Sequence, residues 1–179
     1  TRPLATDTGE KKVTELDWGA ALEFVSRCQN LQATNDTENA GNDGGFVYFP
    51  GNSKAGEELD ENGKTALRSY GSMSYAGLLS LVYADLDAED TRVKAVIEWL
   101  SNNYTLKENP GLDQQGLYYY YHVMAKTLAA ANIPALETKA GKEVDWRGEL
   151  STQVINAQRE DGSWINKTAR WMENDPILV

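Results

Sequence analysis

Two stretches far apart in the chain follow the same order of residues. "EFVSRCQN", with "DGGFVY" after it, and "TQVINAQREDGSWIN" each give an amphipathic helix, a glutamine near its end, and then Asp-Gly-x-aromatic. In this alignment Val25 to Gln29 corresponds to Val154 to Gln158. Recurrence of one helix-and-turn unit is typical of repeat proteins, in which each unit buries its apolar face against the next. The pattern therefore predicts helical units stacked side by side.

Apolar spacings of three and four predict helices over 14–30, 69–86, 87–104, 117–132 and 145–158. Thr14 or Asp17 is expected to cap the first helix, and Asp87 or Asp90 the third. No segment alternates with period two, so the predicted fold class is all-α. The residues expected to face the core are Trp18, Ala21, Leu22, Val25 and Cys28 in the first helix, Val93, Val96, Ile97 and Leu100 in the third, and Leu150, Val154 and Ile155 in the last.

The connections divide the chain into a polar lead-in, residues 1–13, and one structural segment, residues 14–179. Residues 31–69 form a long polar loop interrupted by "DGGFVYFPG", and loops of this length in a domain are usually functional or mobile. Asn-Pro-Gly marks a turn within 105–116, and 133–144 is expected to be a surface loop.

The helices differ in character, which suggests an inner and an outer layer. Residues 69–86 are rich in small side chains that permit close approach, and 117–132 is apolar nearly all round, so both are expected to be enclosed. Stacked and curved, such pairs predict a partial α/α toroid of about two and a half helix-pair repeats. Gln158, Gly162 and Trp164 are then structural: the glycine permits the reversal, and the tryptophan clamps neighbouring repeats.

The stretch "RGELSTQVINAQREDGSW", residues 147–164, resembles the QW motif of squalene–hopene cyclases and of the wider terpenoid cyclase/protein prenyltransferase superfamily. Arg147, Gly148, Gln158, Gly162 and Trp164 occupy the positions of that motif. The chain looks closest to bacterial proteins described as prenyltransferase/squalene oxidase repeat proteins. The resemblance implies an α/α toroid over residues 14–179, a fold that hosts several chemistries.

The resemblance also implies a closed ring with more helix pairs than this chain supplies. The sequence ends at "RWMENDPILV", where a further inner helix is expected to begin. We therefore expect the chain to be a piece of a longer polypeptide, or a partner to complete the ring. Exposed inner helices also favour self-association.

The acid motif that starts class II cyclase reactions is absent from the matching inner helix. Similar enzymes carry Asp-x-Asp-Asp at its head, whereas this chain has Tyr70, Gly71, Ser72 and Met73. The acidic run "DLDAED", 85–90, lies between helices, where such residues act as caps. No catalytic residue is therefore assigned, and the sequence leaves open whether the protein is an enzyme.

Metal sites of the related enzymes are not matched either. Prenyltransferase zinc sites use Asp, Cys and His, but Ser26 stands two residues before Cys28, and the only histidine is His122. One cysteine and one histidine do not make a zinc site without further ligands. No aspartate-rich magnesium motif is present, so we expect no metal and no cofactor.

The cluster "QQGLYYYYH" carries the main candidates for ligand binding. Tyr118 and His122 share a helix face because they are four residues apart, and Gln114 or Gln115 shares a face with Tyr118, whereas Tyr119 covers another side. Because inner helices of such toroids begin near the cavity mouth, Gln115, Tyr118, Tyr119 and His122 are expected to line it. Aromatic walls suit apolar or cationic ligands, and tyrosine or histidine can perform acid–base chemistry on a sugar. The alternative is that these rings pack between helices. Further candidates are Tyr70 at the head of an inner helix, Phe46 and Tyr48 at a rim, and Trp171 as a cap near Asp175.

Charge excludes some partner classes. The net charge of −10 repels nucleic acid and anionic membrane surfaces, and no apolar run is long enough for a membrane span. The single cysteine, Cys28, excludes an internal disulfide framework. Because the chain does not begin with Met, we infer processing or cleavage, which is compatible with an exported bacterial protein without fixing a compartment. We expect a soluble protein.

Three functions are compatible with these observations. The first is a repeat protein that binds an apolar, isoprenoid-like small molecule or a protein on its concave face. The second is a terpenoid cyclase whose proton donor lies outside this segment. The third is a carbohydrate-active α/α toroid, similar to a polysaccharide lyase, that uses tyrosine and histidine.

Overall fold

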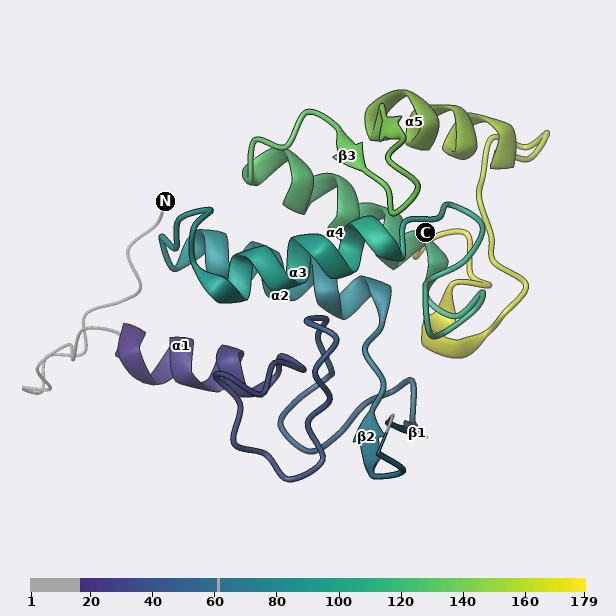
Figure 1. Cartoon of the computed structure of the whole chain (residues 1–179). Coiled ribbons are helices and arrows are strands. Elements are labelled where there is room, and N and C mark those ends of the chain that lie inside the picture. The colour runs from purple at the N-terminus through teal and green to yellow at the C-terminus, as the bar shows by residue number, and fades with distance from the viewer. Residues whose placement is uncertain (1–16, 61) are drawn as a thin grey trace, which may run out of the picture.

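The computed structural model describes residues 17–60 and 62–179, and this part of the chain is mostly helical (Figure 1). The polar lead-in, 1–13, and the candidate cap Thr14 lie outside the described residues. The helices are α1 (Trp18–Arg27), α2 (Gly71–Tyr83), α3 (Thr91–Asn102), α4 (Leu117–Ala130) and α5 (Trp146–Ala157), with a 3-10 turn, η1, at Arg170–Met172. Each predicted helix is present, and the described bounds lie within the predicted ones.

Two short hairpins correct the prediction of a chain without strands. β1 (Glu57–Leu59) pairs antiparallel with β2 (Thr65–Leu67), and β3 (Leu136–Glu137) pairs antiparallel with β4 (Glu143–Val144). Gly63 and Gly141, with φ of +76° and +73°, make the reversals. Strands of two or three residues are too short for a period of two to appear in the sequence.

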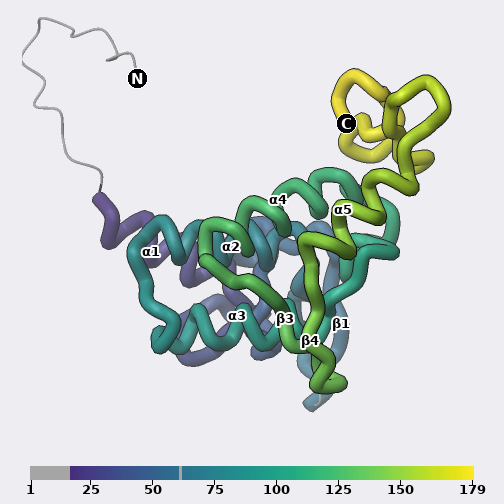
Figure 2. The backbone as a smooth tube through the Cα atoms, turned by 90° about the horizontal axis from the view of Figure 1, so that it is seen from above, coloured from purple at the N-terminus to yellow at the C-terminus, as the bar shows by residue number. Residues whose placement is uncertain are grey.

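The core forms where α2 packs against α4. Leu78 and Leu81 of α2, and Met124 and Leu128 of α4, are fully buried, so their apolar surface supplies much of the folding free energy. α3 and α1 pack against other sides of α2. Figure 2 shows α2 and α4 between α1 at one end and α5 at the other. The two helices predicted to be enclosed therefore lie at the centre of the fold.

Small residues of α2 let its neighbours approach, as predicted. A Cβ atom on Gly71 would lie 2.6 Å from the Pro110 ring and 2.8 Å from the Tyr120 ring. A Cβ atom on Gly77 would collide with the ring of Phe46, which is buried against the helix at this point. Larger side chains at either glycine would push these groups away from α2.

The outer helices follow the predicted stripes only in part. In α3, Val93, Val96 and Leu100 are buried and Ile97 is partly buried, as expected. In α1, Leu22, Val25 and Cys28 reach the core, but Ala21 is exposed and Trp18 is 61 % exposed, because the start of the helix lies at the margin.

The prediction for α5 is wrong at Ile155, which is 69 % exposed. The buried stripe of this helix runs through Trp146, Leu150 and Val154 at spacings of four, and Ile155 lies off it. Trp146 also donates from Nε1 to the Ile133 carbonyl at 2.9 Å, which fixes the start of α5.

Local caps form where the sequence placed them. Asp17 accepts a hydrogen bond from the Ala20 N–H at 2.9 Å, and Asp90 accepts one from Arg92 N–H at 2.9 Å. These carboxylates satisfy helix N–H groups that have no partner within the helix. Asp90, rather than Asp87, therefore caps α3.

The two Asp-Gly turns share one geometry, which supports the repeat seen in the sequence. Gln29 Nε2 donates to the Gly44 carbonyl at 2.9 Å, and Gln158 Nε2 donates to the Gly162 carbonyl at 2.9 Å. Both glycines have positive φ, +85° and +83°, where a side chain would be strained. The glutamine thus ties the end of each helix to its own turn.

The backbone of the two turns matches as well. Asp43 and Asp161 each accept a hydrogen bond at 3.0 Å from the N–H two residues later. Asn30 N–H donates to the Gly45 carbonyl at 2.8 Å, and Arg159 N–H donates to the Ser163 carbonyl at 2.9 Å. The same bonds therefore close a loop of 15 residues, Asn30 to Gly44, in one copy and a short turn, Arg159 to Gly162, in the other.

The aromatic residue after each turn behaves differently in the two copies. Phe46 crosses to α2 and lies against Gly77, whereas Trp164 turns back and donates from Nε1 to the Val154 carbonyl of α5 at 2.8 Å. The hydrogen bond of Trp164 is thus made to the helix that precedes it, and a contact of this ring with a neighbouring unit stays a prediction. Phe46 makes the bridging contact.

Helix length argues against a transmembrane role for any described helix. The longest, α4, has 14 residues, and none found in the described residues is long and apolar enough to cross a bilayer.

Candidate functional site

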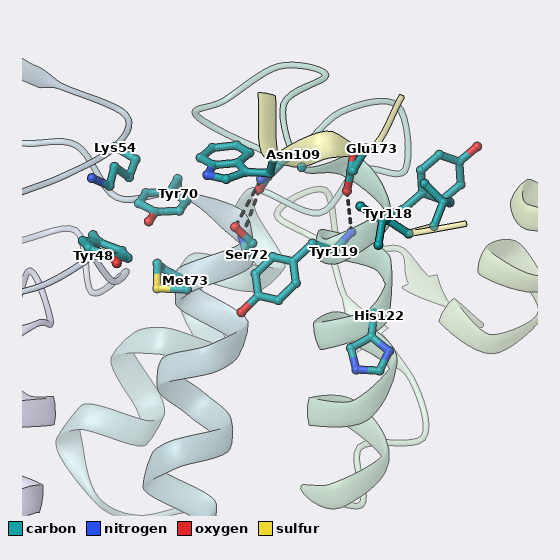
Figure 3. A pocket seen from close by; sticks show the side chains of 14 residues that line it. Tyr48, Lys54, Tyr70, Ser72, Met73, Asn109, Tyr118, Tyr119, His122 and Glu173 are labelled. Atoms are coloured by element: carbon teal, nitrogen blue, oxygen red, sulfur yellow. Dashed lines mark hydrogen bonds between the residues drawn. The ribbon is translucent and has the colours of Figure 1, made fainter. Parts of the chain in front are cut away.

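A pocket of about 750 Å³ lies where α2 and α4 begin (Figure 3). It is lined by Tyr48 and Lys54 from the loop before β1, Tyr70, Ser72 and Met73 from the start of α2, Asn109 and Gly116 from the turn before α4, Tyr118, Tyr119 and His122 from α4, and Trp171, Glu173, Leu178 and Val179 from the C-terminal segment. Its volume is in the range that holds a small organic molecule.

Six of the eight ligand-binding candidates line this pocket: Tyr48, Tyr70, Tyr118, Tyr119, His122 and Trp171. The other two do not. Phe46 is 2 % exposed and lies in the core rather than at a rim. Gln115 faces the C-terminal segment, where its Oε1 accepts a hydrogen bond from Arg170.

The start of α2 is held by a residue from the following turn. Asn109, fully buried, accepts a hydrogen bond from the Ser72 N–H at 3.0 Å. Its Nδ2 donates to the Ser72 hydroxyl at 3.2 Å and to the Gln115 carbonyl at 3.0 Å. One side chain therefore caps α2 and joins it to the turn that leads into α4.

The start of α4 is capped from farther away. Gly116 precedes the helix with φ of +65° and has no side chain to cap it. Glu173 instead accepts a hydrogen bond from the Tyr119 N–H at 2.9 Å, while its other oxygen accepts one from Asn166 Nδ2 at 2.8 Å. A carboxylate beside the positive end of a helix is stabilising, so this contact fastens the C-terminal segment to the pocket wall.

Tyr70 forms the floor of the pocket. It is 3 % exposed, and burial raises the pKa of its hydroxyl above the usual value, with Tyr119 and Tyr48 adding to the shift. Its hydroxyl therefore stays protonated near neutral pH and can donate a hydrogen bond but cannot act as a base. Figure 3 shows Tyr119 between the starts of α2 and α4, with His122 one turn farther along α4.

Trp171 closes one side of the pocket from a strained backbone. Trp171 and Met172 both have positive φ, +63° and +64°, a conformation that costs of order 1 kcal/mol or more for residues with large side chains. The indole lies over Gly116, where a Cβ atom would be 3.1 Å from the ring. Asp175, expected beside this cap, instead accepts a hydrogen bond from Ile177 N–H at 3.0 Å and does not line the pocket.

Two features of the pocket were missed by sequence reasoning. Lys54 places Nζ 4.4 Å from the centroid of the Tyr48 ring, so a cation stands at the mouth. Glu173 lies in the wall. Neither had a local sequence signal, because Lys54 is in a polar loop and Glu173 acts on a helix more than fifty residues away. Asn109 was visible only as the first residue of an Asn-Pro-Gly turn.

The acidic run 85–90 has turn and capping roles. Asp87 accepts a hydrogen bond from Glu89 N–H at 2.8 Å, and Asp90 caps α3. The Arg92 side chain, which bonds to Asp90, holds the pKa of that carboxyl below its usual range. An ionised carboxylate in a cap is poorly suited to donating a proton to an alkene.

Metal ligands are not gathered in the described residues. Cys28 is buried in the core and burial raises the pKa of its thiol to about 11, which disfavours the thiolate that binds metals. His122 lines the pocket at the start of α4. In residues 17–60 and 62–179, no three His, Cys, Asp or Glu side chains converge as a metal site requires.

Comparisons of the chain with protein-family models, with curated proteins and with solved structures find no match.

Proposed function

We propose that the protein binds a small, mainly apolar ligand in the pocket at the starts of α2 and α4. The observation that carries this proposal is the convergence of aromatic rings from four segments of the chain on one cavity of about 750 Å³. Cavities of this size with mainly apolar walls and a few polar groups are typical small-molecule sites. An isoprenoid-like chain or a flat aromatic molecule fits this description.

The rings of the pocket are accessible as well as close together. About half of each of three ring side chains is exposed: 51 % for Tyr48, 50 % for Tyr119 and 47 % for Trp171. Large aromatic side chains are usually more deeply buried than this. A ligand seated on them would remove this apolar surface from water, which favours binding by about 25 cal/mol per Å² of apolar area covered.

The architecture proposed around this pocket is a squalene-cyclase-like partial toroid. Its support is the shared bonding of the two Asp-Gly turns and the central position of α2 and α4. In such an arrangement further helices, from the same polypeptide or a second copy, would continue the inner layer beside α4. The role proposed for this segment is binding rather than proton-initiated chemistry, because Tyr70 and the capped acids supply no strong acid.

Fluorescence of N-phenyl-1-naphthylamine, a neutral apolar probe, tests the proposal. We expect saturable binding to the protein and displacement by an isoprenoid alcohol. Tyr119→Ala should weaken binding about three- to tenfold, as loss of one aromatic contact does. Phe24→Ala is the matched control, since Phe24 is 54 % exposed but lies outside the pocket. Absence of saturable binding, or equal effects of both variants, would refute the proposal.

A second candidate is a carbohydrate-active domain. Tyr119 and His122 line the same pocket, which is the pairing that acid–base chemistry on a sugar needs, and Lys54 supplies a cation for an acidic sugar. Incubation with uronic-acid oligosaccharides, followed by absorbance of the unsaturated product, tests for lyase activity. Product formation that is lost in His122→Ala would favour this candidate over simple apolar binding.

A further inference from the structure

We infer that the ligand of this pocket carries an anionic group, a carboxylate, sulfonate or phosphate, joined to its apolar body. The inference rests on the proposed binding function and specifies its ligand class. The chain has 27 acidic and 17 basic residues, so a random surface site would be negative. The pocket departs from this balance, because Lys54 lines it, Arg170 flanks it on the ring of Trp171, and the Glu173 carboxylate in its wall is engaged in hydrogen bonds.

Lys54 and Arg170 are the two cations. Lys54 Nζ lies 4.4 Å from the Tyr48 ring centroid, and the Arg170 guanidinium lies 4.5 Å from the Trp171 ring centroid. In the part of the chain that the structure describes, no carboxylate forms an ion pair with either one. Both cations therefore rest on aromatic rings of the pocket, and Arg170 donates in addition to Gln115 Oε1, which is an uncharged acceptor, so neither charge is neutralised by these contacts.

The carboxylate of the pocket wall does not neutralise these cations directly. Glu173 is 5 % exposed, and its two oxygens accept hydrogen bonds from Tyr119 N–H and Asn166 Nδ2. Figure 3 shows this carboxylate directed at the start of α4. The Ser72 N–H of α2 likewise donates to Asn109 and is not free to bind an anion. Anion recognition in this pocket is therefore assigned to the cationic side chains and not to the helix ends.

Lys54 and Tyr70 line the same pocket, and Arg170 flanks it through its contact with Trp171. Arg170 opposes the rise that burial causes in the Tyr70 pKa, and Tyr48, whose ring Lys54 contacts, adds to that rise. An anionic group bound beside Tyr48 and Trp171 would lie near the cations that rest on these rings, while the body of the ligand contacts Met73 and Tyr119.

A matched pair of probes isolates the charge. 1-Anilinonaphthalene-8-sulfonate and N-phenyl-1-naphthylamine share one aromatic body, and only the first has a sulfonate. We expect the sulfonate probe to bind more tightly and to lose affinity as salt is raised, while the neutral probe is unaffected. Lys54→Gln and Arg170→Gln should each lower the affinity for the sulfonate probe up to about fivefold, which is the effect of losing one exposed charge pair. Neither variant should change the affinity for the neutral probe.

Lys64→Gln is the control, because it removes the same charge from an exposed site outside the pocket. Weaker binding of the sulfonate probe to the Trp171→Ala variant checks that the probe occupies this pocket. Equal affinity for both probes, or equal losses in Lys54→Gln and Lys64→Gln, would overturn the inference and leave the binding function standing. Failure of both probes to bind would instead remove the proposed function, and the inference with it.

Discussion

The two glutamines that tie helix ends to Asp-Gly turns allow a direct test of how burial sets the value of a hydrogen bond. Gln29 and Gln158 each donate to a glycine carbonyl at 2.9 Å, but Gln29 is fully buried and Gln158 is exposed. Gln29 Nε2 also donates to the Arg92 carbonyl of α3 at 2.9 Å. Replacing each glutamine by alanine therefore removes the same kind of amide hydrogen bond, once from a buried environment and once from an exposed one.

The expected cost at Gln29 follows from three contributions. An unpaired buried carbonyl at Gly44 costs about 1–3 kcal/mol. The one lost methylene group costs about 0.8 kcal/mol. Gln29 Oε1 has no partner, so its removal returns about 1 kcal/mol. Gln29→Ala should therefore destabilise the fold by about 2 kcal/mol, whereas Gln158→Ala should cost less than about 0.5 kcal/mol because water replaces the lost bond.

Urea unfolding followed by circular dichroism measures both values. Gln29→Met is the matched control, because it keeps the chain length and removes only the polar amide, and its cost should lie between those of the two alanine variants. Equal destabilisation by Gln29→Ala and Gln158→Ala would refute the reasoning, since it would mean that the bond itself, and not its burial, sets the energy.

Three further perturbations follow from the caps and the tyrosines. Asp90→Ala should destabilise the protein by about 1–2 kcal/mol in urea unfolding; because the folded-state pKa of Asp90 is lowered, this contribution exists above about pH 4 and disappears as acid titrates the folded carboxyl. Glu173→Ala should cost about 1 kcal/mol and speed amide exchange at Tyr119 measured by NMR. Burial raises the pKa of Tyr75 and Tyr120, so their stabilisation is complete below about pH 10 and is lost at higher pH; ultraviolet titration should show them ionising together with unfolding.

Features with a local signal could be predicted from the sequence. The position of each helix follows from apolar spacing, and Asp17, Asp90 and Asp145 cap α1, α3 and α5 from the residue before each helix. The hairpins were missed because strands of two or three residues show no period. The exposed Ile155 was misplaced because one helix turn offers two neighbouring apolar stripes, and only packing selects between them.

The part of the candidate site that could be predicted is the set of residues whose place follows from their position in a helix. Tyr70, Tyr118 and Tyr119 stand at the starts of two enclosed helices, and the structure brings them to one cavity. Phe46 shows the limit of this reasoning. Its Asp-Gly-x-aromatic pattern predicts the turn, but the space that receives the ring is created by Gly77, thirty-one residues later in the sequence.

The caps of the two central helices explain why the other pocket residues could not be predicted from the sequence. They also explain why the pocket lies where it does. α2 and α4 begin without a local cap, so Asn109 and Glu173 supply it from segments that follow in the chain. Each such bond draws a later segment onto an earlier helix start, and the pocket is the space left between them. Because the caps also build the walls, pocket formation requires the same long-range contacts as the fold itself. Loss of the Glu173 contact should therefore release the Trp171 wall before it unfolds the core.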